Sequence, residues 1–315
     1  MKRREFLAFL AASANAAPKL TYKQRVDRAV AGQDVDRPPF TFWYHFLLEK
    51  LPPERHAEAT LGFHRRLRTD LVKVMSDFPY PKPAGDWYQL KVDANPFPSQ
   101  IRALELIRDG LKGGAYFVET IFNPWNVAEK LSSAEEVQRL KAEKPQALLD
   151  ALEVIAKSEA NHARTAIQTG ASGIFLAIAN AQNGILSPAE YARFSEPFDK
   201  MVLDAVRSAP LNTLHLHGDK VYLEPFFKGW AAAAINYSSQ GTGVPLEAVR
   251  KNFSGVLMGG LEHANFRSLS EAQLKQQWHA AQSAAGKRFL LAPGCSVPND
   301  TTDAELLRLV KVLGA

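Results

Sequence analysis

The chain has 315 residues, one cysteine, a formal net charge of +5 and a sequence pI near 9.2. One cysteine excludes an internal disulfide, and no Lys/Arg run or basic stripe interleaved with aromatic residues points to nucleic-acid binding. The mild positive charge suits an anionic small-molecule substrate, and no stretch after the N-terminus approaches the ~20 apolar residues that a transmembrane span requires.

The N-terminus resembles an export leader. Lys2-Arg-Arg-Glu-Phe-Leu7 is followed by a short apolar run and by the small-residue site Ala14-Asn-Ala16. Paired arginines before such a run are typical of a twin-arginine signal. We therefore expect a leader over residues 1–18 and one globular domain over residues 19–315. Two locations stay open: periplasmic or otherwise exported if the leader is used, and cytoplasmic if it is only an amphipathic N-terminal helix.

Beyond the leader, β-rich runs alternate with helical patterns. The expected strands are residues 40–46, 71–75, 116–122, 173–179, 213–217, 233–237, 256–258 and 289–292. The expected helices are residues 20–31, 53–67, 99–111, 134–169 with a break near Pro145, 188–208, 246–251, 269–285 and 302–313. Apolar strands alternating with helices indicate a parallel sheet buried on both faces. Eight such units predict an α/β fold, a single (β/α)8 TIM barrel.

In a barrel of this kind, the active site lies at the carboxyl ends of the strands. Residues just past the expected strand ends are therefore candidates for the site. They are His45, Asp77, Asn123, Trp125, Asn180, Gln182, Asn183, His215, His217, Asp219, Glu262, His263 and Cys295. Residues 78–98 form a long loop rich in proline and aromatic residues, at the place where a lid or substrate loop would lie.

Two strand ends predict a metal site. Side chains alternate along a strand, so His215 and His217 point to the same face, and Gly218 then ends the strand. A second apolar strand ends in a Pro-Gly turn followed by Cys295. If both strands belong to one barrel, two imidazoles and a thiol meet at one rim, and zinc accepts such a set with a fourth position open. The alternative is a pair of hydrogen-bonded core histidines and a small buried cysteine.

Six segments, in the correct order, are similar to the uroporphyrinogen decarboxylase superfamily over residues 21–315. They include the opening helix with its Val35-Asp-Arg-Pro-Pro39 turn, Met75-Ser-Asp-Phe78, Asn123-Pro-Trp125, Gly184-Ile-Leu-Ser-Pro188, Met258-Gly-Gly-Leu-Glu262 and Leu291-Ala-Pro-Gly-Cys-Ser-Val-Pro298. The resemblance implies the barrel fold, and it places the central aspartate of the decarboxylases on Asp77.

The chain departs from the true decarboxylases where their arginines bind substrate carboxylates. Those arginine positions fall on Tyr44 and Leu48, the family's tyrosine falls on Lys130, and its late histidine falls on Gly294. Guanidinium groups suit carboxylates because they bind them in a bidentate manner. A substrate with many carboxylates would therefore lack its main charge complements here.

The second branch that the chain resembles is the methylcobamide:coenzyme M methyltransferases. Their zinc ligands, a His-x-Cys strand and a Cys in an LAPGC-like turn, correspond to His215, His217 and Cys295, with His217 replacing a cysteine. The resemblance implies zinc-dependent methyl transfer to a thiol, from a corrinoid presented by a corrinoid protein or from another methyl donor. Two imidazoles and one thiolate leave zinc with about one net positive charge, which makes it a stronger Lewis acid than a two-thiolate site.

Roles are also expected for the residues at the rim. Asp77 and His45 are expected to be catalytic, as orienting groups or a general base. Substrate contacts are expected from Tyr44, Asn123, Trp125, Asn180, Gln182, Asn183 and Glu262. Two alternatives stay open: a decarboxylase of porphyrin metabolism in which Asp77 stabilises a protonated pyrrole, and a non-catalytic exported ligand-binding barrel. A homodimer is a further expectation, because barrels of this kind often dimerise.

Overall fold

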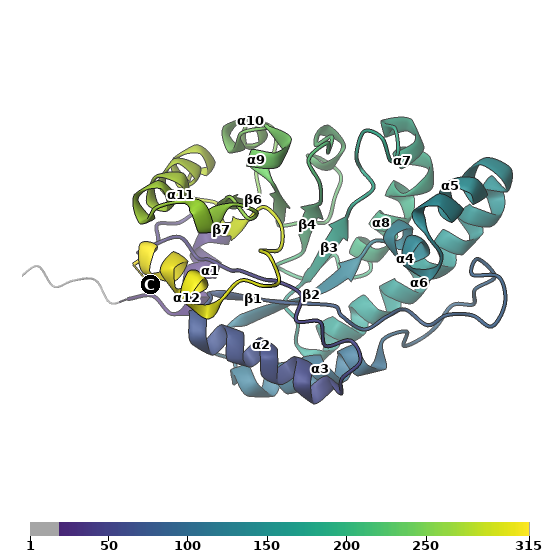
Figure 1. Ribbon diagram of the computed structural model, residues 1–315, viewed down its shortest axis with the longest axis horizontal. Coiled ribbons are helices and arrows are strands. Elements are labelled where there is room, and N and C mark those ends of the chain that lie inside the picture. Colours follow the sequence, from purple (N-terminus) through teal and green to yellow (C-terminus); the bar gives the residue numbers. More distant parts are fainter. Residues whose placement is uncertain (1–18, 315) are drawn as a thin grey trace, which may run out of the picture.

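A computed structural model describes residues 19–314, and the leader expected over residues 1–18 lies outside this range. Seven parallel strands form one sheet in sequential order, and helices cover its outer face (Figure 1). The strands are β1 (Leu71–Val74), β2 (Tyr116–Phe122), β3 (Ile174–Ile178), β4 (Thr213–Leu216), β5 (Ala234–Tyr237), β6 (Val256–Leu261) and β7 (Phe289–Pro293). Nearly every strand residue is buried, as expected for a parallel sheet with side chains packed on both faces.

The helices begin and end largely where the sequence predicts. They are α1 (Tyr22–Ala31), α2 (Pro53–Leu67), α3 (Pro98–Leu111), α4 (Pro124–Leu131), α5 (Ala134–Glu143), α6 (Pro145–Thr169), α7 (Pro188–Phe194), α8 (Glu196–Asp204), α9 (Ser239–Thr242), α10 (Leu246–Arg250), α11 (Glu271–Ala285) and α12 (Asp303–Val312). The break near Pro145 is confirmed, whereas the expected helix 188–208 divides at Ser195, just before Pro197. In the described range, no helix is both long and apolar enough to cross a membrane.

The prediction of eight strands is wrong for the described residues, because residues 40–46 make only one parallel bridge, from Phe40 to Leu291. Thr41 N donates to Leu291 O, Leu291 N donates to Pro39 O, and Asp70 N donates to Phe40 O. This segment therefore lies between β7 and the residue before β1. The ladder to β7 does not extend, because Pro293, two residues after Leu291, has no N–H to donate. The fold is a curled, TIM-barrel-like sheet of seven strands.

Helix α1 covers the amino-terminal end of the sheet. Thr21 and Gln24 form a capping box that starts this helix. Val26 and Ala29 are each 1% exposed, and they lie against residues that begin the strands. These include Leu71 of β1, Thr213 of β4, Ala234 of β5 and Val256 of β6. Because α1 covers the amino-terminal end, a site can form at the carboxyl ends of the strands.

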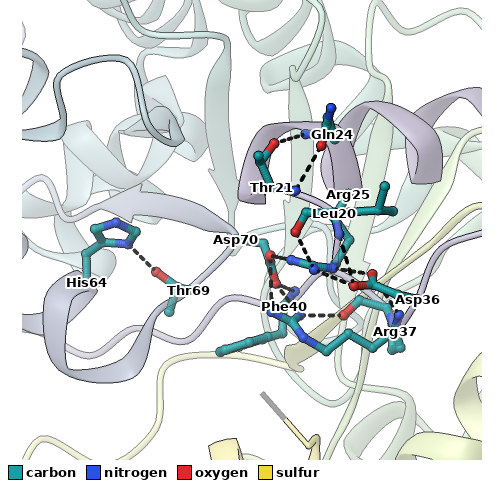
Figure 2. A network of polar contacts seen from close by, with 11 residues as sticks. Leu20, Thr21, Gln24, Arg25, Asp36, Arg37, Phe40, His64, Thr69 and Asp70 are labelled. Atoms are coloured by element: carbon teal, nitrogen blue, oxygen red, sulfur yellow. Dashed lines mark hydrogen bonds and ion pairs between the residues drawn. The ribbon is translucent and has the colours of Figure 1, made fainter. Parts of the chain in front are cut away.

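A network of charged side chains fixes α1 to the start of β1 (Figure 2). Arg25 donates through Nε to Asp36 Oδ1 at 2.7 Å and through Nη1 to Asp70 Oδ1 at 2.5 Å. The second oxygen of Asp70 accepts from Arg37 Nη1 at 2.5 Å and from Phe40 N at 3.0 Å. Asp70 is fully buried, and both of its oxygens have partners. This end of the molecule therefore buries charge in a fully hydrogen-bonded form.

Candidate functional site

The sheet brings His215, His217 and Cys295 together at its carboxyl end. His217 Nδ1 lies 3.1 Å and His215 Nε2 lies 3.7 Å from Cys295 Sγ, and one ligand atom from each residue lies within 4.8 Å of the others. A sulfur and a nitrogen bound to one zinc ion lie about 3.6 Å apart, given metal–ligand distances of about 2.3 and 2.0–2.1 Å and a tetrahedral angle. The three residues therefore fit a metal ion.

Neighbouring strands hold the ring of His215 in one orientation. Its Nδ1 lies 2.6 Å from Asn236 Oδ1 on β5, and its face stacks on Phe175 of β3 with ring centroids 5.0 Å apart. Asn236 Nδ2 donates to the carbonyl oxygens of Met258 and Pro293, so its Oδ1 is an acceptor. His215 consequently carries its proton on Nδ1, and the lone pair of Nε2 is free for a ligand.

The three side chains also shift one another's ionisation. Burial alone would raise the pKa of the Cys295 thiol, but its contacts with the rings of His215 and His217 lower this pKa to about 4. The hydrogen bond with Cys295 raises the pKa of His217, whereas burial lowers the pKa of His215. At neutral pH the sulfur is therefore a thiolate, which is the form that binds metals.

The metal-side cavity, about 370 Å³ in volume, is lined by these three residues and by Lys73, among others. Lys73 on β1 is 7% exposed, with its ammonium 4.9 Å from the ring centroid of Phe175 and 5.4 Å from that of Trp43. Burial lowers the pKa of Lys73 to about 7. Sequence reasoning missed both Lys73 and Asn236, and the available signal was a single polar residue within each apolar strand.

Asp77 and His45 lie next to each other, with His45 Nδ1 3.2 Å from Asp77 Oδ1. His45 lines the metal-side cavity, whereas Asp77 lines a second cavity of about 310 Å³. The two cavities share Thr120, Phe122 and Lys130 in their walls. His45 and Asp77, the predicted catalytic pair, therefore lie between the two adjoining cavities.

The loop over residues 78–97 covers the second cavity. Phe78, Tyr80 and Phe97 contribute to its lining. Asp93 fixes the loop to α6, because its N donates to Ser158 Oγ at 2.9 Å and its carbonyl oxygen accepts from Asn161 Nδ2 at 2.9 Å. The loop expected to act as a lid or substrate loop thus forms one wall of a cavity.

Three of the residues expected to bind substrate are enclosed in the protein. Asn123 and Asn180 are fully buried, and Asn123 Nδ2 donates to Asn180 Oδ1 at 2.8 Å and to Asp199 Oδ1 at 3.0 Å. Trp125 is fully buried, and its Nε1 donates to Glu129 Oε1 at 2.8 Å. None of the three lines either cavity. In this structure the two asparagines link the ends of β2 and β3 to α8, and Trp125 bonds within α4.

Four more of these residues lie outside both cavities: Tyr44, Gln182, Asn183 and Glu262. Tyr44 packs edge-on against Phe63 of α2, with ring centroids 5.4 Å apart. Gln182 Nε2 donates to a backbone carbonyl at 2.6 Å, and Asn183 is exposed. Glu262 Oε1 accepts from a backbone N–H at 2.8 Å. Substrate binding by these four stays a prediction without a contact that supports it.

Comparison with known proteins agrees with the fold and with the resemblance. The family model described as Uroporphyrinogen decarboxylase (URO-D) matches residues 78–314. No curated protein matches the sequence. A methyltransferase from Methanosarcina mazei superposes with a TM-score of 0.73 at 19% identity, covering 94% of this chain and 99% of that chain. A B12-independent methionine synthase from Shewanella sp. W3-18-1, in complex with selenomethionine, gives a TM-score of 0.56 at 10% identity over 88% and 91%.

Proposed function

Because the chain belongs to the uroporphyrinogen decarboxylase family, we propose that it is an enzyme that transfers a methyl group to a thiol, with zinc held by His215, His217 and Cys295. The observation that carries the proposal is the convergence of three ligand atoms within 4.8 Å in the wall of the metal-side cavity. The fold shared with the methyltransferase from Methanosarcina mazei supports methyl transfer as the reaction. A corrinoid, presented by a corrinoid protein at the carboxyl end of the sheet, is the donor that this branch suggests.

A bound zinc ion would supply a Lewis acid that lowers the pKa of an incoming thiol. The chain supplies the rest of the site. Asn236 keeps the Nε2 lone pair of His215 free, and Cys295 is ionised before any ligand arrives. The ammonium of Lys73, held against aromatic rings, attracts a thiolate in the metal-side cavity.

His45 and Asp77 are the proposed route for the proton of the thiol. Asp77 Oδ1 accepts from His45 Nδ1, which leaves His45 Nε2 as the basic nitrogen. The side chain of His45 is 36% exposed, so the proton it takes from the thiol passes on to solvent. Asp77 acts through His45 and holds the imidazole in the tautomer that can accept.

Decarboxylation of a porphyrinogen is supported less well. No arginine lines either cavity in the described part of the chain. Volumes of about 370 and 310 Å³ lie near the lower end of the usual range for ligand pockets, about 300–1,000 Å³. Both observations favour a small substrate over a tetrapyrrole with many carboxylates. Export by the leader and a homodimer stay predictions.

Metal content and activity test the proposal together. The wild-type protein, expressed with added zinc, should carry about one zinc per chain, and Cys295→Ser and His217→Ala should lose it, because removing one of three ligands opens the site. His279→Ala, which removes an exposed histidine on α11, is the matched control and should keep the metal. The zinc-loaded wild type should also demethylate methylcobalamin when a thiol is added.

Two results would contradict the proposal. A wild-type protein that takes up no zinc would leave a decarboxylase or a ligand-binding barrel. Zinc that stays bound in Cys295→Ser would place the metal elsewhere. Release of carbon dioxide from a carboxylate substrate, abolished in Asp77→Asn and unaffected in Cys295→Ser, would establish the decarboxylase instead.

A further inference from the structure

Several buried polar atoms in or next to the wall of the second cavity have no hydrogen-bond partner among residues 19–314. They are Asp77 Oδ2, Tyr80 Oη, Glu159 Oε2, His162 Nδ1 and both ring nitrogens of His56. An unpaired buried polar group costs free energy, so most such groups in native proteins have a partner. Among these atoms, His56 Nδ1 lies 3.7 Å from Asp77 Oδ2, which places a ring nitrogen beside an acceptor.

Aromatic rings enclose His56 and hold it beside Asp77. His56 lies near the start of α2 and is fully buried, and the side chain of Asp77 is 4% exposed. The ring of His56 packs edge-on against Phe46 and Phe78, with ring centroids 6.1 and 5.8 Å away. A buried ring in contact on two sides has few other rotamers, so Nδ1 stays beside the carboxylate.

A neutral His56 carries one ring proton, and its surroundings favour Nδ1 as the position. Burial lowers the pKa of His56, although the charges of Asp77 and Glu119 raise it, so the ring is neutral at neutral pH. On Nδ1 the proton faces a carboxylate oxygen that accepts no other hydrogen bond in the described range. The competing acceptor is the backbone of Met75, whose carbonyl oxygen already accepts from Gln100 Nε2 at 3.0 Å. A carboxylate is the stronger acceptor, so the proton belongs on Nδ1.

Asp77 then has one histidine at each oxygen. Its Oδ1 lies 3.2 Å from His45 Nδ1, and its Oδ2 faces His56. A carboxylate held at one oxygen can still turn about its Cβ–Cγ bond, whereas donors at both oxygens fix its plane. The second contact is longer than the usual N–H···O distance of about 2.7–3.2 Å, so it closes with a movement of about 0.5–1 Å. Catalytic hydrogen bonds are often long before substrate binds.

The orientation of Asp77 matters because His45 has little packing of its own. The side chain of His45 is 36% exposed. Its backbone is fixed, since His45 N donates to Asn299 Oδ1 at 3.1 Å, but Asp77 is the hydrogen-bond partner of its ring. The direction of the Asp77 carboxylate therefore determines the orientation of the His45 ring in the wall of the metal-side cavity.

We propose that His56 is a positioning residue that donates Nδ1–H to Asp77 Oδ2 and so fixes the carboxylate with Oδ1 on His45 Nδ1. The inference rests on the proposed function only for the task of His45, which takes the proton of the thiol. In that step the S–H bond breaks, the sulfur keeps the electron pair, and the proton forms a bond with His45 Nε2. His56 gains and loses no proton, and its hydrogen bond keeps Asp77 ionised and in place.

The ring tautomers test this arrangement without reference to the reaction. We would record nitrogen-15 spectra of the full-length protein labelled at histidine, at about pH 8, where a free imidazole is neutral. The signals are assigned through their loss in His45→Asn and His56→Asn. In the wild type, both His45 and His56 should carry the proton on Nδ1, because an oxygen of Asp77 accepts from each ring.

Two substitutions separate the donor of His56 from its packing. His56→Phe keeps an aromatic ring and removes the donor, so the His45 proton should move from Nδ1 toward Nε2. His56→Asn places an amide N–H where Nδ1 lies and should keep the wild-type tautomer of His45. The matched control is His64→Phe on the same helix, which removes a ring contact with Thr69 at 3.1 Å and should leave the His45 tautomer unchanged.

The kinetics of the zinc-loaded protein add a second readout. With methylcobalamin and a thiol, His56→Phe should lower kcat about 10-fold and change KM for the thiol by less than about twofold, because proton transfer depends on His45 and thiol binding does not. His56→Asn should restore kcat to within about threefold of the wild type.

A wild-type His56 with its proton on Nε2 would overturn the inference, and so would an unchanged His45 tautomer in folded His56→Phe. A kcat that is unaffected in His56→Phe would overturn it as well. If His56→Phe does not fold, the wild-type tautomer of His56 decides the question. The expected tautomers in a protein that transfers no methyl group would support the hydrogen bond from His56 while the proposed function fails, so the two failures are distinguishable.

Discussion

The two ends of the sheet differ in whether their buried charged side chains have hydrogen-bond partners. At the amino-terminal end, both oxygens of Asp70 have partners, and Arg25 donates to two carboxylates (Figure 2). At the carboxyl end, buried Glu159 and Asp77 each keep an oxygen without a partner in the described range. A hydrogen-bonded buried network stabilises a fold, whereas a buried polar group without a hydrogen-bond partner costs free energy and points to a binding or catalytic role. The difference separates the structural end of this protein from its functional end.

The largest expected effect lies at the structural end. Asp70→Asn should reduce the free energy of unfolding by about 3–5 kcal/mol, because it leaves Arg25 and Arg37 without their shared carboxylate. Urea denaturation of the variant and the wild type measures the loss. Asp204→Asn, which breaks an exposed pair with Arg207, is the control and should change stability by less than about 1 kcal/mol. Equal losses in the two variants would remove the contrast between the ends.

A smaller effect is expected at the metal-side cavity. Asn236→Ala should weaken zinc binding about 10–100-fold, because His215 loses the acceptor that orients its ring. Competition with a chromophoric chelator measures the affinity of the folded protein. Asn252→Ala removes an exposed asparagine and should leave the affinity unchanged. Unchanged affinity in Asn236→Ala would mean that packing on Phe175 alone orients the ring.

The smallest change, taken per pH unit, concerns Lys73. Burial lowers its folded-state pKa from 10.5 to about 7, so between these values the unfolded chain binds more protons than the folded protein. The stability of the wild type should therefore rise with pH across this window, by at most about 1.4 kcal/mol per pH unit from this group. Lys73→Met should lack this contribution. Parallel stability–pH curves for the two proteins would show that the ammonium is not destabilised by burial.

Most of the fold could be predicted because its signals are local. The apolar run that became β2 and the proline that starts α6 depend only on neighbouring residues. The failure at residues 40–46 has its cause on another strand: the segment is rich in aromatic residues, but Pro293 of β7 has no N–H with which to continue the ladder after Leu291. Composition alone favoured a strand there, whereas the missing hydrogen-bond donor belongs to the neighbouring strand.

The candidate site could be predicted only in part. His215, His217 and Cys295 follow from strand alternation and from the common rim of a parallel sheet. Asn123 and Asn180 also follow strand ends, yet their amides turn into a network with Asp199. Position in the chain places a residue at the end of a strand, whereas its hydrogen-bond partners determine the direction of its side chain.

Sequence reasoning could not identify Glu159 and His162 as buried residues, because both lie in the middle of a long helix. In the sequence, they look like polar residues of a surface helix. Both are 1% exposed because the loop over residues 78–97 packs across α6. Such a contact between distant segments cannot be inferred from periodicity, which describes one segment at a time.

Under the proposed function, the position of α1 has a consequence for catalytic turnover. Val26 and Ala29 seal the amino-terminal end of the sheet, so small molecules enter and depart through the same opening. A methyl donor that docks over that opening would block the exit of the finished product. Turnover would then follow a compulsory order, with the acceptor first in and the methylated product leaving only after the spent donor has moved away.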